Sequence, residues 1–268
     1  MKNTLCRLLL LFLTIPLGLN AQTINAAYVK SLYKKYPTLK SDFCASCKLW
    51  VNPYFKSIAD TALHYPVLTY YVYTRAHRLT QEALDLPRSG IYAGWHAVPG
   101  QPNETPVYTE ANKQINKTYT DSEIQKGHCQ AWILMAWSID AALLSNTYTF
   151  NAAMEYRGQN LGTQIETEEM CRTLTGNDGA PTLTDSVKIW CGTFGRKMSY
   201  RTKKVEITVP SHYYKVIEYR AKKTGKIVRL CYWMPNDPSE ERTKLPERKV
   251  SYKKLINNLG FDPQQIFR

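Results

Sequence analysis

The sequence predicts an α+β fold, and three observations support this prediction. Short segments rich in aromatic and β-branched residues recur along the chain, helical segments lie among them, and the two kinds follow no regular βαβ rhythm. The chain is 268 residues long and 44% hydrophobic, which is enough apolar material for a sizeable core. A disordered tail, a collagen-like fibre and a small disulfide-stabilised protein are thereby excluded.

Residues 1–21 are typical of a secretory signal peptide. Lys2 and Arg7 form a basic start, a short apolar run extends from Leu8 to Leu17, and cleavage is expected near Ala21. An N-terminal membrane anchor is the competing interpretation, but the run is too short to span a bilayer with ease. We therefore expect a secreted or periplasmic protein that has no membrane contact once the leader is removed.

The rest of the chain is expected to consist of an N-terminal extension over residues 22–60, irregular or partly helical, and one domain over residues 61–268. Residues 66–74 (PVLTYYVYT) are the first expected strand. Residues 85–118 are dense in Gly, Pro, Asn and Thr and are expected to form a long loop region. A helix is expected over 160–174, strands at 187–191, 205–209, 213–219 and 227–233, and a last short helix at 252–259.

Seven cysteines are present, and Cys6 would be removed with the leader. The even number that remains suggests disulfides in an exported chain, although the sequence does not give the pairing. Cys44 and Cys47 form a single CxxC motif. A structural role is favoured for it, because no second CxxC motif or closely spaced histidine pair completes a zinc set. A redox pair, as in an exported thiol–disulfide protein, is the second interpretation.

The chain is strongly basic. Lys and Arg number 35 against 22 Asp and Glu, so the formal net charge is +13. This excess favours an anionic partner: nucleic acid, an acidic polysaccharide or a membrane surface.

Two segments in the middle of the chain hold residues of chemical interest. Residues 125–128 (QKGH) place a cation and a flexible glycine beside an imidazole. Further on, Asn160, Gln164, Glu168 and Arg172 recur at every fourth position, so on a helix they form one polar stripe. Taken alone, the stripe favours a solvated helix face.

Together the two segments indicate a metal-assisted phosphodiesterase. Such an enzyme needs a base for water, a hard cation on the phosphate and a positive group for the developing charge. His128 is the candidate base. Asn160 can offer a carbonyl oxygen to Mg²⁺, with Mn²⁺ as an alternative ion, and Glu168 can hold one of the waters of the ion. Lys126 and Arg172 can contact phosphate oxygens.

These residues resemble the motifs of the DNA/RNA non-specific endonucleases, which are related to endonuclease G and belong to the ββα-metal (His-Me finger) type. QKGH aligns with the family signature Asp-Arg-Gly-His, and NAAME and NLGTQ align with the Asn-containing stretches that follow it. VKIWCGTFG, ITVPSHYYKVIEY and WMPN resemble later family segments, so the resemblance extends from about Pro66 to Asn236.

The resemblance implies a ββα-metal nuclease fold, in which helices flank a central, mainly antiparallel sheet. It also implies metal-dependent cleavage of DNA, RNA or both, to give 5′-phosphates. His128 falls on the general base of the family and Asn160 on its metal ligand. Glu168 falls on the residue that positions water, and Arg172 on a phosphate-binding arginine. DNA versus RNA preference and oligomeric state are left open.

Several positions depart from the family pattern. Lys126 replaces Arg, Gln125 replaces Asp, and Met154 and Glu155 replace Pro and Gln. Glu155 is expected to add a negative charge near the phosphate unless it binds the cation. These changes leave open a polyanion-binding protein on the same scaffold that has lost its chemistry.

Outside these motifs, His212 is expected to be a packed strand residue. Arg75 or Arg88 could add a phosphate contact.

Overall fold

The computed structural model describes residues 26–86, 94–115, 123–176 and 181–268. The predicted signal peptide and Arg88 lie outside these residues. Within them, no helix has the length and apolar character needed to cross a membrane.

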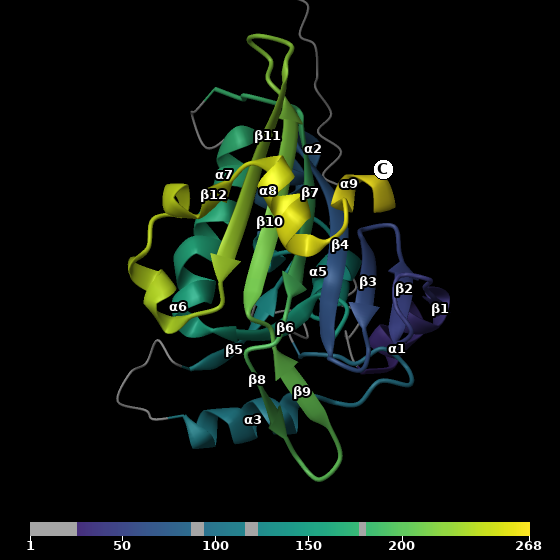
Figure 1. The fold of residues 1–268 in the computed structure, drawn as a ribbon. Helices are drawn as coiled ribbons and strands as arrows, with labels where there is room; N and C mark the ends of the chain where they lie inside the picture. The colour runs from purple at the N-terminus through teal and green to yellow at the C-terminus, as the bar shows by residue number, and fades with distance from the viewer. Residues whose placement is uncertain (1–25, 87–93, 116–122, 177–180) are drawn as a thin grey trace, which may run out of the picture.

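An eight-stranded sheet runs through the centre of the molecule, in the order β1-β2-β3-β4-β7-β10-β11-β12 (Figure 1). Every neighbouring pair is antiparallel. The predicted α+β class and mainly antiparallel sheet are therefore confirmed. The strands are β1 (Thr38–Lys40), β2 (Cys47–Val51), β3 (Lys56–Asp60), β4 (Tyr65–Thr74), β7 (Ser186–Phe194), β10 (His212–Arg220), β11 (Ile227–Pro235) and β12 (Lys249–Val250).

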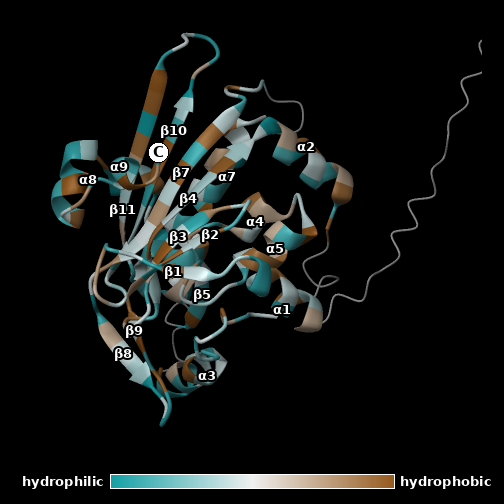
Figure 2. Cartoon of the chain, turned by 90° about the vertical axis from the view of Figure 1, so that its right-hand side faces the viewer, coloured by the Kyte–Doolittle hydropathy of each residue, from teal (hydrophilic) through white to brown (hydrophobic). Residues whose placement is uncertain are grey.

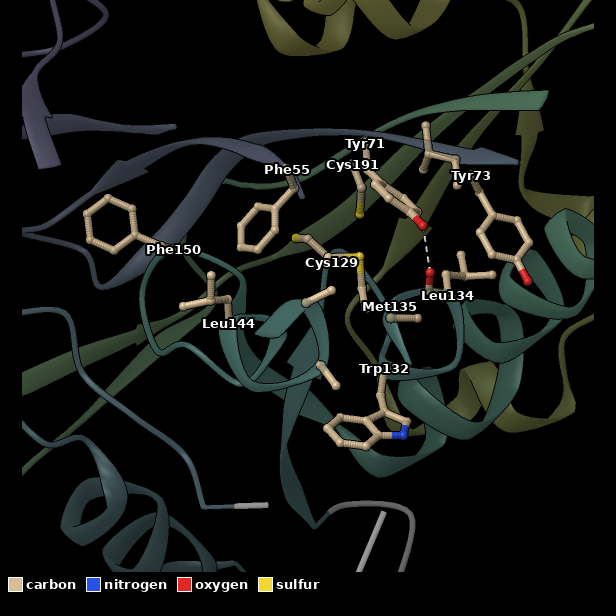
Figure 3. Close-up of a cluster of buried hydrophobic side chains, with 14 of the residues drawn as sticks. Phe55, Tyr71, Tyr73, Cys129, Trp132, Leu134, Met135, Leu144, Phe150 and Cys191 are labelled. Carbon is tan, nitrogen blue, oxygen red and sulfur yellow. Dashed lines mark hydrogen bonds between the residues drawn. The ribbon is translucent and has the colours of Figure 1, made fainter. Parts of the chain in front are cut away.

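The two faces of the sheet bury different clusters, because successive strand residues point to opposite sides. Tyr71 and Tyr73 on β4 pack on one face, whereas Leu68 and Tyr70 pack on the other. Figure 2 shows helices on both sides of the sheet, and Figure 3 shows part of the larger cluster. The first face is covered by α1 (Ala26–Lys35), α4 (Trp132–Met135), α5 (Ile139–Ser145) and α7 (Ile165–Leu174), and the second by α8 (Tyr252–Leu259) and α9 (Pro263–Ile266).

Two hairpins lie at one end of the sheet. β5 (Ile124–His128) pairs with β6 (Ala152–Tyr156), and β8 (Met198–Arg201) pairs with β9 (Glu206–Val209). Residues of both hairpins share a third apolar cluster with α3 (Thr105–Gln114). The remaining helices are α2 (Arg75–Leu84), α6 (Arg157–Gln159), the π-helical turn η2 (Asn160–Gln164) and the 3₁₀ turns η3 (Pro238–Arg242) and η4 (Leu245–Arg248).

The strands predicted from residue 66 onward are confirmed with small shifts at their ends, and so is the last predicted helix at 252–259. The expectation of an irregular or partly helical extension over residues 22–60 agrees with α1, but it is wrong for residues 38–60, which contain three strands of the central sheet. Those strands are short and carry lysines, so they have little apolar pattern and depend on pairing with neighbours. The boundary predicted at residue 61 falls inside the β3–β4 hairpin. The predicted loop over 85–118 is also corrected, since it contains α3.

One disulfide is present among the described cysteines, and it joins Cys44 to Cys47. Cys129, Cys171, Cys191 and Cys231 are buried thiols. Asp60 lies beside the disulfide, with its Oδ2 3.8 Å from Cys44 Sγ. A nearby carboxylate disfavours a thiolate, so the site lacks the electropositive surroundings of a reactive cysteine. This environment favours the structural interpretation of the CxxC motif.

Replacing both Cys44 and Cys47 with serine should lower the free energy of unfolding by about 2 kcal/mol, the entropic effect of opening a very short loop. Urea unfolding measures the change. Dithiothreitol should destabilise the wild type to the same extent and leave the double variant unaffected. A double variant as stable as the wild type would show that the disulfide contributes nothing to the fold.

Candidate active site

The β5–β6 hairpin and the helical segment after it bring the predicted site residues together. His128 is the last residue of β5, and Asn160 is the first residue of η2. Position 127 of β5 requires glycine, because a Cβ there would lie 1.8 Å from Oε2 of Glu155 on the paired strand β6. Gly162 interrupts the helix with non-helical angles of φ −95° and ψ −115°, and a Cβ on it would lie 2.4 Å from the Glu240 carbonyl oxygen.

A hollow of about 410 Å³ is lined by Lys126, His128, Asn160 and Glu168. Four of the five predicted site residues therefore converge, although 42 residues separate the first from the last in the sequence. These residues lie on the C-terminal half of β5, at the start of η2 and in the first turn of α7. The rest of the lining comes largely from α2 and α4, whose residues include Gln81 and Trp132.

Arg172 does not line this hollow. Its Nη1 forms an ion pair with Glu169 at 3.0 Å. The prediction of one continuous polar stripe assumed a regular α-helix from residue 160 onward, but the π turn and the break at Gly162 change the rotation of the chain. Gln164 is consequently fully buried, and its Nε2 donates to the His128 carbonyl oxygen at 2.6 Å. Gln164 thus fixes the backbone of His128.

The imidazole of His128 is held in one orientation. Its Nε2 lies 2.9 Å from Asn146 Oδ1, and its ring centroid lies 4.7 Å from that of Trp95. An amide oxygen can only accept, so Nε2 carries the hydrogen and the basic lone pair is on Nδ1. His128 is 7% exposed, which limits its freedom to rotate.

The loop between β5 and β6 is held by amide side chains that the sequence alone did not single out for this purpose. Asn151 Oδ1 accepts from the Gln130 N–H at 2.8 Å, and Asn151 Nδ2 donates to the Gln130 and Ser145 carbonyls at 2.9 and 2.7 Å. The same loop carries Asn146, the partner of His128. The family alignment at Asn151 was the available signal, but only the structure shows that its role is to tie the loop.

The carboxamide of Asn160 is oriented for an ion. Its Nδ2 donates to Gln125 Oε1 at 2.7 Å, which leaves its carbonyl oxygen as the ligand atom. Gln125 stands where the family has Asp, and it retains the acceptor that this bond needs. Glu168 lines the same hollow and can hold a water of the ion. A neutral oxygen ligand with a nearby carboxylate fits Mg²⁺, which keeps several of its waters.

Among the described residues, no group of three or more His, Cys, Asp or Glu side chains in this hollow lies close enough together to bind one metal ion. The one such group in the described ranges is Cys44, Cys47 and Asp60, and its two cysteines are joined in the disulfide. An ion at Asn160 would accordingly be held mainly through water.

Lys126 lies between two aromatic rings. Its Nζ is 5.8 Å from the Trp95 ring centroid and 5.2 Å from that of Tyr108. Burial lowers the pKa of Lys126, an effect that Glu123 opposes. A second hollow of about 480 Å³ contains both rings and shares Lys126, Asn160 and Leu161 with the first. The two hollows therefore adjoin at Lys126, Asn160 and Leu161, and together they are called the groove.

Glu155 does not line the groove, whereas the sequence suggested a carboxylate near the phosphate. It is fully buried, and neither carboxyl oxygen accepts a hydrogen bond of ordinary geometry from the described residues. Burial raises the pKa of Glu155 well above its usual value, and Glu168 adds to this effect, while Lys215 and Gln159 oppose it. Burial thus favours the neutral form of this carboxyl, which packs against Gly127.

Lys215 is a buried cation that the sequence analysis did not identify. It is 1% exposed, and its Nζ donates at 2.7 Å to Oγ1 of Thr167, the residue that precedes Glu168 on α7. Burial disfavours its charged form, but Cys191 and Glu168 outweigh burial and raise the pKa of Lys215. The available signal was a lysine on the same strand face as Tyr213 and Ile217.

The other candidate residues lie outside the hollow of His128. His212 is half-buried and stacks on Trp233 with ring centroids 4.6 Å apart, as expected for a packed strand residue. Arg75 Nη1 donates to the Thr175 carbonyl at 2.8 Å and so serves the fold.

Comparison with known proteins gives one family match and a structural neighbour. Residues 38–265 match the family described as DNA/RNA non-specific endonuclease. Among solved structures, the chain is similar to one from the crystal structure of the EndoG/EndoGI complex, with a TM-score of 0.61 and 16% identity over 81% of this chain and 86% of that chain. At this identity the likeness shows the fold alone. No curated protein matches the chain.

Proposed function

The chain belongs to the DNA/RNA non-specific endonuclease family, and from this premise we propose that it is an exported, Mg²⁺-dependent endonuclease that hydrolyses phosphodiester bonds of DNA, RNA or both. The convergence of His128 and Asn160 on one hollow carries the proposal. The signal-peptide-like start supports export to the periplasm or the medium. The positive charge of the chain supports a polyanionic substrate.

In the proposed reaction, His128 Nδ1 takes a proton from a water molecule. The water oxygen bonds to phosphorus while the bond between phosphorus and the 3′-oxygen breaks, and the leaving oxygen is protonated by water. The products are a 5′-phosphate and a 3′-hydroxyl. Lys126 contacts a non-bridging phosphate oxygen, and Glu168 orients a water. Bound through Asn160, Mg²⁺ would supply charge neutralisation at the phosphate.

The groove predicts little base specificity at the cleaved bond. Lys126 and the ion would contact phosphate oxygens, and the phosphate group is the same at every nucleotide. The contact of Arg172 with phosphate stays a prediction, since its guanidinium pairs with Glu169 outside the hollow.

Chelation of divalent ions tests the proposal directly. EDTA should abolish digestion of plasmid DNA and of RNA, and excess Mg²⁺ should restore it, because the donor set offers the phosphate no other divalent charge. Gel electrophoresis of both substrates measures the loss and the recovery. Cleavage that persists in EDTA would reject the role of Asn160. Salt-sensitive binding with no cleavage in Mg²⁺ or Mn²⁺ would support the polyanion-binding alternative.

A further inference from the structure

Lys215 is a buried cation that no step of the proposed hydrolysis uses. It lies on β10, in register with Cys191 of β7 and Tyr232 of β11. Its strand face also carries Tyr213 and Ile217, which pack in the same apolar cluster as α7. Lysine is almost never fully buried unless it is paired, because removing an ammonium from water is costly. The fold therefore keeps this charge in mainly apolar surroundings only because specific partners hold it.

Three hydrogen bonds connect the ammonium to the backbone of the candidate base. Lys215 Nζ donates to Thr167 Oγ1 at 2.7 Å, and Thr167 Oγ1 donates its one hydrogen to the Gln164 carbonyl oxygen at 2.6 Å. Gln164 Nε2 donates to the His128 carbonyl oxygen at 2.6 Å. Thr167 and Gln164 are fully buried, so water does not compete for these bonds. The chain of bonds therefore joins β10 of the central sheet to α7, η2 and the end of β5.

The segment held by these bonds carries Glu168. Thr167 and Glu168 are consecutive residues in the first turn of α7, and Glu168 lines the hollow of His128. Burial disfavours the charged form of Lys215, but Cys191 and Glu168 outweigh burial and raise the pKa of Lys215. Electrostatic attraction is mutual, so the ammonium also favours the ionised carboxylate of Glu168, the form that can orient a water of the ion.

Two other groups compete with Glu168 for this positive charge. Burial raises the pKa of Glu155, and Glu168 adds to that effect, while Lys215 opposes both without reversing them. Glu155 is thus the weaker partner. Burial also disfavours the thiolate of Cys191, but Cys129 and Lys215 outweigh it and lower the pKa of Cys191. The thiol is therefore the competitor that an experiment must separate from Glu168.

We propose that Lys215 is a positioning residue of the hydrolytic site. Through Thr167 it holds the η2–α7 segment to the central sheet, so that Glu168 and the backbone of His128 keep the geometry that hydrolysis needs. Lys215 does not line the hollow, so it acts through these residues and not on the phosphate. The proposal rests on the proposed nuclease function and adds a residue to it.

Cleavage kinetics of Lys215→Met and Thr167→Val test this role. Methionine keeps most of the length of lysine without the charge, and valine keeps the shape of threonine without the hydroxyl. Each variant should lower kcat on plasmid DNA in Mg²⁺ by roughly tenfold to a hundredfold and leave KM within about threefold, because neither side chain contacts the substrate. The double variant should lose little more than Lys215→Met, since both changes open the same chain of bonds. Thr167→Ser, which keeps the hydroxyl, should retain nearly the wild-type kcat.

Two controls separate positioning from other roles of the lysine. Tyr213→Phe removes a buried hydroxyl two residues earlier on the same face of β10, and it should keep the wild-type kcat. Cys191→Ser removes the competing thiol and should also keep the wild-type kcat. A lysine that only stabilised the fold would lower the melting temperature in Lys215→Met and leave the kcat of the folded protein unchanged. An equal loss of kcat in Cys191→Ser would assign the ammonium to the thiol and overturn the proposal.

Hydrogen exchange of backbone amides in EDTA tests the positioning without cleavage. Peptides that cover residues 160–170 should exchange at least about fivefold faster in Lys215→Met and in Thr167→Val than in the wild type, the effect of about one lost hydrogen bond. Tyr213→Phe should leave their exchange unchanged. Unchanged kcat or unchanged exchange in both variants would overturn the role of Lys215, and Thr167→Val decides the matter alone if Lys215→Met does not fold. Absence of cleavage by the wild type would contradict the nuclease proposal alone, because exchange still reports whether Lys215 holds the segment.

Discussion

Replacing His128 with alanine should lower the rate of DNA and RNA cleavage by roughly 10²- to 10⁴-fold, the usual contribution of a general base. The reason is geometric: Nε2 is used by Asn146, so Nδ1 is the nitrogen that can take the proton of the attacking water. The melting temperature should fall by only a few degrees, because the substitution removes about one buried hydrogen bond. Single-turnover cleavage of a supercoiled plasmid and thermal unfolding by circular dichroism give the two numbers.

The control for this experiment is His212→Ala, which removes a half-buried histidine that lies outside the groove. It should cleave at nearly the wild-type rate. Asn146 offers a second comparison, since Asn146→Asp keeps an acceptor for Nε2 and Asn146→Leu removes it. The aspartate variant should retain more activity than the leucine variant. Full activity of His128→Ala would remove the imidazole from the mechanism.

The parts of the fold that sequence patterns predict are those with their own apolar periodicity. The β10 segment HYYKVIEYR and the β11 segment IVRLCYWMP are rich in β-branched and aromatic residues, and α8 has an apolar face and a Ser251 cap. β1 is a three-residue edge strand whose residues are half-buried or exposed, and it exists because β2 supplies its hydrogen bonds. Such a strand has no apolar pattern of its own from which the sequence could predict it.

In the site, too, some residues have a local sequence signal and others depend on tertiary packing. His128 and Asn160 are found from motif order, because the β5–β6 hairpin and the helix after it form one compact unit. The expectation that Arg172 shares one polar stripe with Asn160 assumed regular α-helical spacing, but the chain forms a π turn at Asn160–Gln164, where Gly162 packs closely on Glu240. The ionisation of Glu155 and the burial of Lys215 depend on strands and helices that only folding brings together.

Replacing Glu155 with glutamine, the residue of the family pattern at this position, should stabilise the protein increasingly as the pH rises. Burial raises the pKa of Glu155 well above its usual value of 4.5. Between the unfolded and the folded pKa, the native state therefore binds a proton that the unfolded state has lost. Across that window the free energy of unfolding falls by about 1.4 kcal/mol for each pH unit. Glutamine has nearly the same shape and does not titrate, so the variant escapes this loss.

Urea unfolding of the wild type and Glu155→Gln at pH 4.5 and at pH 8 measures the difference. The two proteins should be similar at pH 4.5, and the variant should be more stable at pH 8, by on the order of 1.4 kcal/mol for each pH unit between the unfolded and the folded pKa that the change in pH crosses. Glu206→Gln, in an exposed ion pair with Arg196, controls for the loss of a carboxylate and should change stability by less than about 1 kcal/mol. An equal difference in the free energy of unfolding between the two proteins at pH 4.5 and at pH 8 would mean that Glu155 is ionised in the folded protein. Its charge would then lie beneath the β5–β6 hairpin, next to Gly127, and would oppose phosphate binding as the sequence first suggested.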